Sequence, residues 1–316
     1  MIKLDILCGL GNQLFEYAYA RTLSLEYNEP IVINKMTVLT LLNKFKYPKM
    51  GSASYQLKYF NIVQCMFQNS LIGFIQSIFP FLHAYLHRKK TNDRKYLANL
   101  FLKMSAKGKY YFADSAMAGY FPHSTTKKKI KHVHGIWCSD KYFYKYSDII
   151  KKELKVISPL SEQNKDLIGE MQNCSSVAVH FRRGDYVNIK DVALSYNICD
   201  EAYYKKSMHY IAERTENPIF YIFSDDIPWI QNNIKFEHTV KFIDNNNPGH
   251  EDLRLMYNCK HFITANSTFS WWGSYLSDNP EKIVISPNIY NMLYPDIKDI
   301  FRDDMILYDI RNQIFL

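Results

Sequence analysis

Two arginines and an aspartate directly follow an apolar run in the second half of the chain. Residues 177–186 read Val-Ala-Val-His-Phe-Arg-Arg-Gly-Asp-Tyr. The apolar start is typical of a buried strand, and in an open α/β sheet ligands bind where strand carboxyl ends meet their loops. Arginine holds phosphate oxygens with a planar fork, so Arg182 and Arg183 predict a phosphate site. A salt bridge to Asp185 that only fixes the turn is the structural alternative.

Two carboxylates follow a second apolar run. Residues 218–223, Pro-Ile-Phe-Tyr-Ile-Phe, predict a strand, and Ser224, Asp225 and Asp226 come next. At the ligand edge of a sheet, a carboxylate can accept two N–H bonds from a guanine, coordinate a divalent metal, or cap the helix that follows. The residues alone leave these three roles open.

Hydroxyl side chains begin a predicted helix after a third strand, 261–265. They are Ser267, Thr268 and Ser270, beside Asn266. Hydroxyls and free backbone amides at a helix start suit a phosphate, and an N-cap explains them equally well. The two arginines, the aspartates and the hydroxyl-rich start of this helix all lie at the ends of strands in one predicted sheet. Together they suit a nucleoside diphosphate, with its base on the acid and its phosphates on arginine and helix.

The N-terminal turn also offers backbone amides to a ligand. Residues 2–7 predict a strand, and a glycine turn at 8–13 leads into a helix over 14–25. Gly9 and Gly11 match half of the dinucleotide fingerprint G-x-G-x-x-G, which makes the motif weak. Small residues still let amides at a helix start approach a ligand closely.

Strands and helices alternate through the second half of the chain, which predicts a doubly wound parallel sheet. At 316 residues the chain exceeds the usual size of one core, so we expect two domains, 1–159 and 160–316. The predicted strands are 30–34, 132–137, 177–181, 218–223, 239–243, 261–265 and 283–285. The predicted later helices are 142–154, 163–171, 200–214, 249–259 and 266–275.

Composition narrows the function classes. An apolar content of 47% with 22% charged residues indicates an ordinary globular protein, and the net charge of +8 favours an anionic partner. The six cysteines show neither a C-x-x-C pair nor zinc spacing, which indicates free thiols in a reducing cytosol. The N-terminal residues lack the apolar region of a signal peptide.

Two basic stretches suggest functions other than catalysis. Lys127, Lys128, Lys129 and Lys131 form a basic run near aromatic residues, but no RNP-like, KH or zinc-knuckle pattern accompanies it. The apolar residues 71–86 precede the basic residues 87–90 and are too few to span a bilayer. This segment either contacts an anionic membrane face or forms a buried helix pair kinked at Pro80.

Four motifs together resemble those of the α-1,2-fucosyltransferases, glycosyltransferase family 11. They are Gly9-Leu10-Gly11-Asn12-Gln13-Leu14-Phe15, His180-x-Arg182-Arg183-Gly184-Asp185-Tyr186, Phe223-Ser224-Asp225-Asp226 and Ala265-Asn266-Ser267-Thr268-Phe269-Ser270-Trp271-Trp272. The motifs occur in the family's order and extend over nearly the whole chain. Cys8 is a departure, because the family pattern has a glycine there. The chain resembles the bacterial members, which build surface polysaccharides.

The resemblance implies an α/β fold of the GT-B type, with two Rossmann-like domains facing a cleft. It implies an inverting transfer of L-fucose from GDP-fucose to the 2-hydroxyl of a terminal galactose, with neither an essential metal nor a cofactor. Residues 160–316 would bind GDP-fucose, a co-substrate, and 1–159 a galactose-terminated acceptor, free or lipid-linked. The expected location is the cytoplasm, with peripheral membrane contact left open and nucleic acid not expected as a partner.

The chemistry of this transfer suggests roles for single residues. Negative charge grows on the β-phosphate as the fucosyl bond breaks, and Arg182, helped by Ser267 and Thr268, would stabilise it. His180 and Asp225 are the candidates for guanine recognition. The candidates for the base are Asp185, Glu16 and Glu251, of which Asp185 joins Arg182 in the predicted catalytic pair. The predicted donor-binding residues are His180, Arg182, Arg183, Asp225, Asn266, Ser267, Thr268, Ser270, Gly9, Gly11, Asn12 and Gln13.

Two other functions compete with this one. The first is a metal-dependent nucleotide-sugar glycosyltransferase in which Asp225 and Asp226 hold Mg²⁺ or Mn²⁺ on the diphosphate. The second is a non-enzymatic protein that binds RNA or a membrane surface through residues 127–131 and 71–90.

Overall fold

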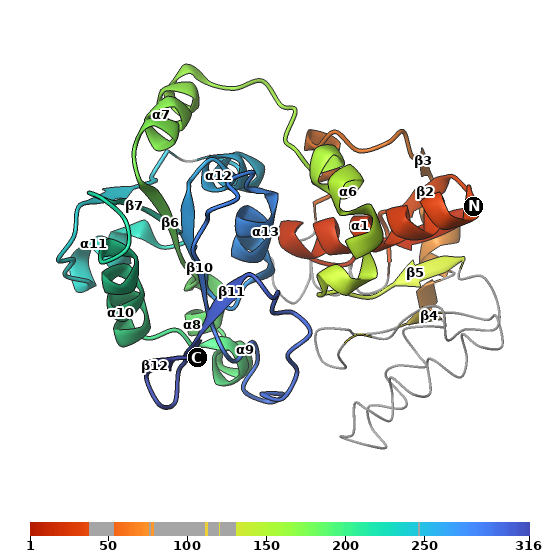
Figure 1. Ribbon diagram of the computed structural model, residues 1–316. Coiled ribbons are helices and arrows are strands. Elements are labelled where there is room, and N and C mark those ends of the chain that lie inside the picture. The colour runs from red at the N-terminus through yellow and green to blue at the C-terminus, as the bar shows by residue number, and fades with distance from the viewer. Residues whose placement is uncertain (38–53, 76, 79–110, 113–119, 121–130, 246) are drawn as a thin grey trace. The chain divides into compact units, whose positions relative to one another are not determined.

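The chain forms two α/β units. The computed structural model describes residues 1–37, 54–75, 77–78, 111–112, 120, 131–245 and 247–316. The units are Met1–Leu154 (unit 1) and Lys155–Leu316 (unit 2), so the division falls between 154 and 155 rather than between 159 and 160. Each unit has its own sheet of mainly parallel strands with helices packed on it (Figure 1).

The sheet of unit 1 has its described strands in the order β3-β2-β1-β5-β4, all parallel. From β1 the chain continues to β2 and β3 on one side and then to β4 and β5 on the other, so the strand order reverses at β1. Ligands of open α/β sheets bind at such a reversal. The strands are β1 (Ile2–Asp5), β2 (Ile31–Asn34), β3 (Met66–Phe67), β4 (Tyr111–Phe112) and β5 (His132–His134).

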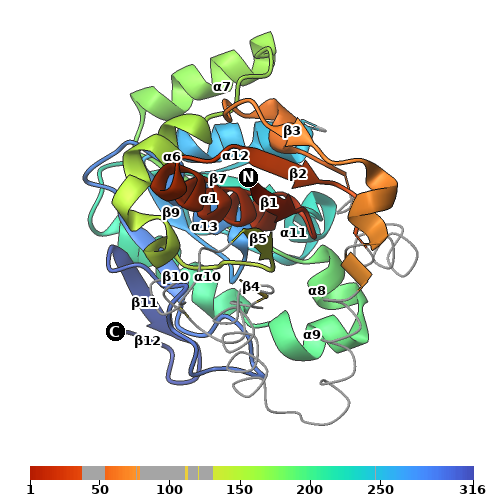
Figure 2. The ribbon, with the colours of Figure 1, turned by 90° about the vertical axis from the view of Figure 1, so that its right-hand side faces the viewer.

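Helix α1 (Leu10–Tyr27) packs on β1 and β2 (Figure 2) and is buried along most of its length. It ends at Asn28, whose left-handed φ of 52° lets its N–H bond back to the carbonyl of Ser24. Helix α6 (Ser147–Glu153) is tied to α1, because Glu153 accepts from Tyr17 Oη at 2.6 Å and pairs with Arg21 Nη2 at 2.9 Å. Short 3₁₀ helices span Leu57–Tyr59, Asp140–Tyr142 and Tyr144–Tyr146.

The sheet of unit 2 has the order β12-β11-β10-β9-β6-β7-β8. Every neighbouring pair is parallel except β11 with β12. From β8 to β11 this is the doubly wound order of Rossmann folds, whose reversal falls between β6 and β9. The strands are β6 (Ser176–Phe181), β7 (Ile219–Ser224), β8 (Val240–Phe242), β9 (His261–Ile263), β10 (Val284–Pro287), β11 (Met305–Asp309) and β12 (Ile314–Phe315).

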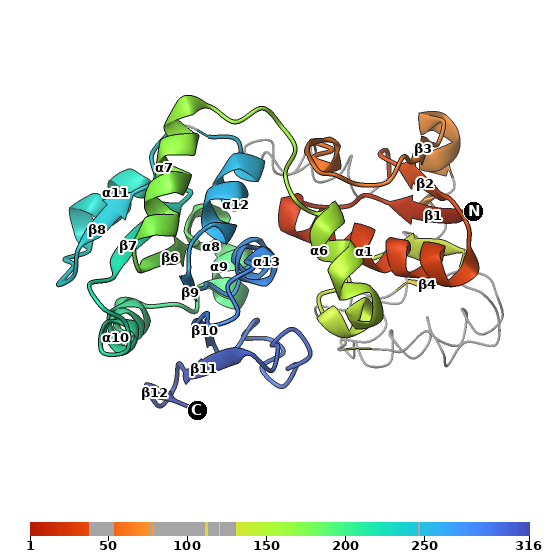
Figure 3. The same cartoon turned by 45° about the horizontal axis from the view of Figure 1, so that its top comes forward.

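Helices cover both faces of this sheet because side chains of a strand alternate between faces. Val177, Val179 and Phe181 of β6 pack with α10 and α11, whereas Ala178 packs with α7 and α12. Figure 3 shows α7 and α12 together and α10 apart from them. The helices are α7 (Glu162–Asn173), α8 (Gly184–Asn188), α9 (Lys190–Tyr196), α10 (Glu201–Ala212), α11 (Ile227–Asn233), α12 (Gly249–Tyr257) and α13 (Thr268–Leu276).

Some sequence predictions lie outside the described residues. These are the basic run at 127–130, Pro80 and most of segment 71–90. At the start of that segment Leu71, Ile72 and Ile75 are exposed, so the buried-helix interpretation is wrong for these three side chains. Within the described part of the chain, no helix is both long and apolar enough to cross a bilayer.

Candidate active site

The polar loops predicted from the sequence follow three neighbouring strands of unit 2. Strand β6 is hydrogen-bonded to β7 on one side and to β9 on the other, and all three run in parallel. Their carboxyl ends therefore lie at one edge of the sheet. Residues 182–186, 224–226 and 264–270 follow these ends, at the reversal of strand order where α/β folds bind ligands.

Arg182 lies at the centre of this edge. Its Nη2 is 2.5 Å from Oδ1 of Asp185, and its Nη1 is 2.8 Å from Oδ2 of Asp225. Burial disfavours the charged guanidinium, but the two carboxylates more than offset it and raise the pKa of Arg182. Each Nη carries a second N–H, and the side chain is 31% exposed, so donors remain for an anion. The salt bridge to Asp185, which the sequence analysis gave as the structural alternative, is present. A contact between Arg182 and a phosphate stays a prediction.

Arg183 points to different partners from its neighbour. Its guanidinium carbon lies 3.1 Å from the centre of the Trp229 ring, and its Nε is 3.3 Å from Oδ2 of Asp226. Asp226 also caps α11, because its Oδ1 accepts from the N–H of Trp229 at 3.3 Å. Guanine recognition, metal coordination and helix capping were the three roles left open for the aspartates. Asp226 caps a helix.

Asp225 is held by the turn that carries the arginines. Its Oδ1 accepts from the backbone N–H of Arg183 at 2.9 Å, and its Oδ2 pairs with Arg182. Gly184 lies so close that an added Cβ would be 2.4 Å from Oδ2. Glycine is thus required here if the carboxylate is to keep its place. Guanine recognition by Asp225 stays a prediction and would have to use the remaining lone pairs.

His180, at the end of β6, is a buried imidazole with a free nitrogen. Its side chain is 5% exposed, its ring centre lies 5.5 Å from that of Phe269, and its Nδ1 has no hydrogen-bond partner within the described residues. Burial, reinforced by the charge of Arg182, lowers the pKa of His180 to about 3, so the ring is neutral at pH 7. A buried nitrogen without a partner is costly, and a bound ligand could satisfy it.

The start of α13 uses its hydroxyls internally. Ser267 caps the helix by accepting from the N–H of Phe269 at 3.3 Å, and Ser270 donates to the carbonyl of Ala265 at 3.4 Å. Ser267 and Ser270 are buried, whereas Thr268 is half-buried. What this helix start can offer a phosphate is therefore its first backbone amides, with Thr268 beside them.

Tyr186 connects the loops after β6 and β9, a role that the sequence analysis does not assign. Its hydroxyl donates to the carbonyl of Asn266 at 3.1 Å, and its ring stacks on Tyr196 at 5.1 Å between centres. The side-chain amide of Asn266 donates to the carbonyls of Tyr196 and Tyr290, at 3.0 Å each. Asn266 thus braces neighbouring loops, and its predicted donor contact remains untested.

In unit 1, α1 begins at Leu10 rather than at the predicted Leu14, so Gly11, Asn12 and Gln13 lie in the helix and not in a glycine turn. Gly9 is the N-cap residue, and a Cβ added to it would meet no atom within 4 Å, so the turn is open there. Gln13 is fully buried and ties the turn to residues 54–56, donating to the carbonyls of Cys8 at 2.8 Å and Ser54 at 3.0 Å. Gly11 is buried and Asn12 half-buried within the first turn of α1.

The three base candidates have different surroundings. Asp185 is 9% exposed and contacts Arg182 at the edge of unit 2. Glu251 accepts from Ser158 Oγ at 2.5 Å and is also buried. Glu16 is fully buried in unit 1, and this burial raises its pKa well above the usual value. Only Asp185 of the three contacts the predicted catalytic arginine.

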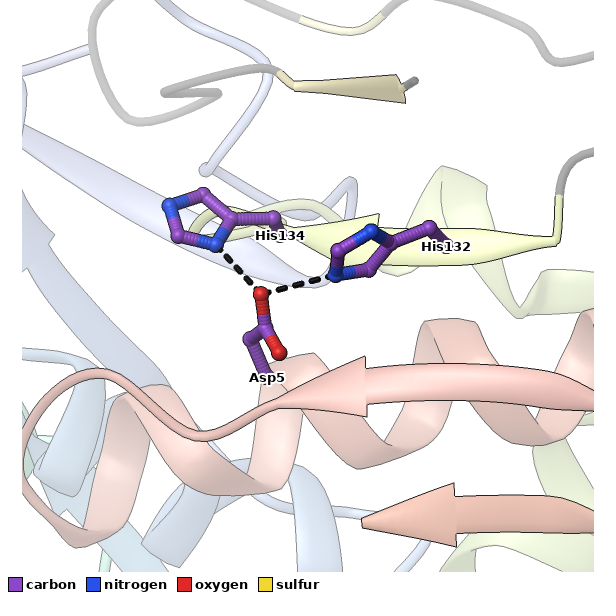
Figure 4. A group of neighbouring side chains, drawn as sticks. All are labelled: Asp5, His132 and His134. Atoms are coloured by element: carbon purple, nitrogen blue, oxygen red, sulfur yellow. Dashed lines mark hydrogen bonds and ion pairs between the residues drawn. The ribbon is translucent and has the colours of Figure 1, made fainter. Parts of the chain in front are cut away.

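One group of metal-ligating side chains occurs within the described residues, and it lies in unit 1. It consists of Asp5, His132 and His134 (Figure 4). Burial would raise the pKa of Asp5, but the two imidazoles bonded to it hold that pKa well below its usual range. Asp225 and Asp226, the metal ligands of the competing interpretation, are each paired with an arginine instead.

Comparisons with known proteins agree with the motifs. Residues 1–307 match the profile of Glycosyl transferase family 11. An alpha-1,2-colitosyltransferase of Escherichia coli is 31% identical over 292 residues, covering 88% of each chain. A galactoside alpha-(1,2)-fucosyltransferase 1 of Rattus norvegicus is 26% identical over 213 residues, covering 64% of this chain and 49% of the relative. The fucosyltransferase NodZ from Bradyrhizobium gives a TM-score of 0.47 at 14% identity, covering 89% of this chain and 96% of that one.

The two units, each with a sheet of mainly parallel strands, confirm the α/β part of the predicted fold class. The chain belongs to glycosyltransferase family 11.

Proposed function

We propose that the protein is a galactoside α-1,2-fucosyltransferase that inverts the fucose anomeric carbon and needs no metal. The observation that carries this proposal is Arg182, held between Asp185 and Asp225 at the strand-order reversal of unit 2 with N–H donors to spare. The α-1,2 linkage is supported by the names of the two enzyme relatives, one a colitosyltransferase and one a galactoside fucosyltransferase.

In the proposed reaction the galactose 2-hydroxyl attacks the fucose C1 from the side opposite GDP. The C1–O bond breaks, its electron pair goes to the β-phosphate, and the hydroxyl proton goes to a base, for which Asp185 is our candidate. Arg182 and the first amides of α13 stabilise the charge that grows on the phosphate. His180 and Asp225 bind the guanine, and unit 1 holds the acceptor.

Metal independence is supported by the pairing of the acids. Asp225 pairs with Arg182 and Asp226 with Arg183, so guanidiniums occupy the place that a divalent ion would take. Cys65, Cys174, Cys199 and Cys259 are free thiols, which supports the cytoplasm as the location.

A second donor is GDP-colitose, favoured by the 31% identity to the colitosyltransferase. Colitose lacks the 3-hydroxyl of fucose. Comparing the two donors therefore tests whether the protein contacts that hydroxyl. The deciding experiment incubates the protein with lactose and GDP-fucose, GDP-colitose, GDP-mannose or UDP-galactose, and detects products by mass. The proposal is supported if GDP-fucose gives a fucosylated lactose from which a 1,2-specific fucosidase releases the fucose. Transfer from GDP-colitose alone selects the second donor, and transfer from UDP-galactose alone contradicts both.

A further inference from the structure

Three side chains from two neighbouring strands of unit 1 converge on one point. His132 and His134 are two residues apart on β5, so both point to the same face of the sheet. The parallel pairing of β1 with β5 brings Asp5, at the end of β1, beside them. Nε2 of His132 lies 2.7 Å and Nδ1 of His134 lies 2.6 Å from the same oxygen, Oδ2 of Asp5 (Figure 4).

The donor atoms suit a divalent transition metal. Two imidazole nitrogens and one carboxylate oxygen are ligands that Zn²⁺ binds, whereas Ca²⁺ and Mg²⁺ prefer oxygen alone. All three ligand atoms lie within 4.8 Å of one another. Zinc bonds of about 2.0–2.1 Å in a tetrahedron place ligand atoms roughly 3.3 Å apart. A small outward rotation of the three side chains would therefore admit the ion.

The carboxylate is oriented by a second layer of contacts. Its other oxygen, Oδ1, accepts from Nδ2 of Asn34 at 2.7 Å. Asn34 is itself fixed, because its Oδ1 accepts from the N–H of Met36 at 3.1 Å and its Nδ2 also faces the carbonyl of Gly73 at 3.3 Å. Hydrogen bonds of this kind hold the ligating carboxylates of metal sites in place. Oδ2 of Asp5 is thus presented to the two histidines.

Of the three ligands, His132 is the most exposed. Asp5 is fully buried and the His134 side chain is 5% exposed, but the His132 side chain is 13% exposed. A fully buried carboxylate needs a positive partner. An ion reaching the site past His132 would supply that charge and keep one coordination position for water.

We propose that Asp5, His132 and His134 bind one divalent transition-metal ion, Zn²⁺ or an ion of like preference, that joins β1 to β5. The ion is structural: it stabilises unit 1 and takes no part in the sugar transfer. Zinc retention by these three ligands is measured without any sugar transfer, so its outcome does not depend on the proposed transferase activity.

The test uses the full chain, stripped with EDTA, desalted with a phosphine reductant present, and titrated with ZnCl₂. We expect one equivalent of zinc to survive a second desalting and to raise the melting temperature. The double variant His132→Gln/His134→Gln should retain less than a tenth of an equivalent. The control is His209→Gln, which removes an exposed histidine of α10 that pairs with Glu213 at 3.1 Å. It should bind zinc as the wild type does.

Cobalt gives a readout that does not depend on the variants folding. Wild-type protein loaded with Co²⁺ should show the visible bands of a four- or five-coordinate nitrogen and oxygen site. A thiolate charge-transfer band would mean that cysteines bind the ion, which would overturn the proposal. Zinc retention below a tenth of an equivalent by the wild type, or full retention by a folded double variant, would also overturn it.

Discussion

Oδ2 of Asp225 lies 2.8 Å from Nη1 of Arg182, and the two residues follow different strands. Asp225 comes after β7 and Arg182 after β6, so this ion pair joins two of the loops at the ligand edge of unit 2. The pair orients the guanidinium before any ligand arrives. Pre-orientation lowers the entropy lost on binding, because a long side chain no longer has to be ordered.

Replacing Arg182 with lysine should slow turnover. Lysine keeps the charge but cannot span Asp185 and Asp225 with a planar fork. If the guanidinium also meets the departing phosphate, its loss appears in kcat as well as KM. We expect a loss of about 10²–10³ in kcat, the usual cost of removing one such donor. Steady-state kinetics with GDP-fucose and lactose, and the melting temperature, measure both effects.

Arg183→Lys is the matched control. Arg183 has the same charge but lies on Trp229 and pairs with Asp226, so its replacement should cost far less turnover. We expect Arg182→Lys to lower kcat by ~10²-fold or more. If the variant keeps more than about half of the wild-type kcat, the phosphate role is wrong. A lower melting temperature with normal turnover would then identify Arg182 as purely structural.

Gly184→Ala should weaken GDP binding. The added Cβ would lie 2.4 Å from Oδ2 of Asp225, so the carboxylate must move and release Arg182 and the N–H of Arg183. Losing one or two such bonds should raise the Kd for GDP roughly tenfold. Calorimetry measures this Kd. Gly169→Ala in α7 is the control, because its Cβ would meet no atom within 4 Å. Equal GDP affinity in both variants would show that Asp225 does not organise the site.

GDP should protect the protein from thermal unfolding, and UDP should not, because we assign guanine recognition to Asp225 and His180. Ligand at about 100 times its Kd contributes ~2.7 kcal/mol. The shift should be the same in EDTA as in Mg²⁺ or Mn²⁺, because the aspartates already pair with arginines. Protection by GDP that vanishes in EDTA and returns with Mn²⁺ would favour the metal-dependent alternative. Equal protection by UDP would remove the guanine assignment.

His180 should make the protein less stable in mild acid. Its folded pKa of about 3 lies below the ordinary value of 6.5, so the unfolded chain takes up the proton first. Stability is therefore unaffected well above pH 6.5 and is lost as pH falls toward 3, by about 2 kcal/mol at pH 5. His180→Gln should lack this loss. Urea unfolding of both proteins at pH 7 and pH 5 measures it, and parallel losses would contradict the assignment to His180.

The regular elements were the most predictable part of the fold. The strand predicted at 218–223 is β7 (Ile219–Ser224), and the helix predicted at 200–214 is α10 (Glu201–Ala212). Strand β7 is a continuous apolar run buried on both faces, and α10 has apolar residues at helical spacing, and both patterns are visible in the sequence. Helices α8 and α9 and strand β12 were not predicted, because they are short and their patterns mix polar and apolar residues. Strand β11 was also missed, although its first four residues are apolar.

The candidate site was predictable only as far as strand ends could be recognised. That placed Arg182 and Asp225 at one edge, as the structure has them. The bridge from Tyr186 to Asn266 and the cluster around Asp5 were not predicted, because both depend on contacts between residues far apart in sequence. A single sequence carries no signal for the pairing of β1 with β5, which brings His132 and His134 to Asp5.

Strand β6 has a hydrogen-bonded neighbour on each side, and Arg182 is the first residue beyond it. Amides in the middle of β6 should exchange with heavy water only when unit 2 opens globally, whereas those of the following turn exchange in local openings. The change from exchange by global opening to exchange by local opening should occur close to Arg182. Substitutions in this turn can thus change the candidate site without altering the slowest-exchanging backbone.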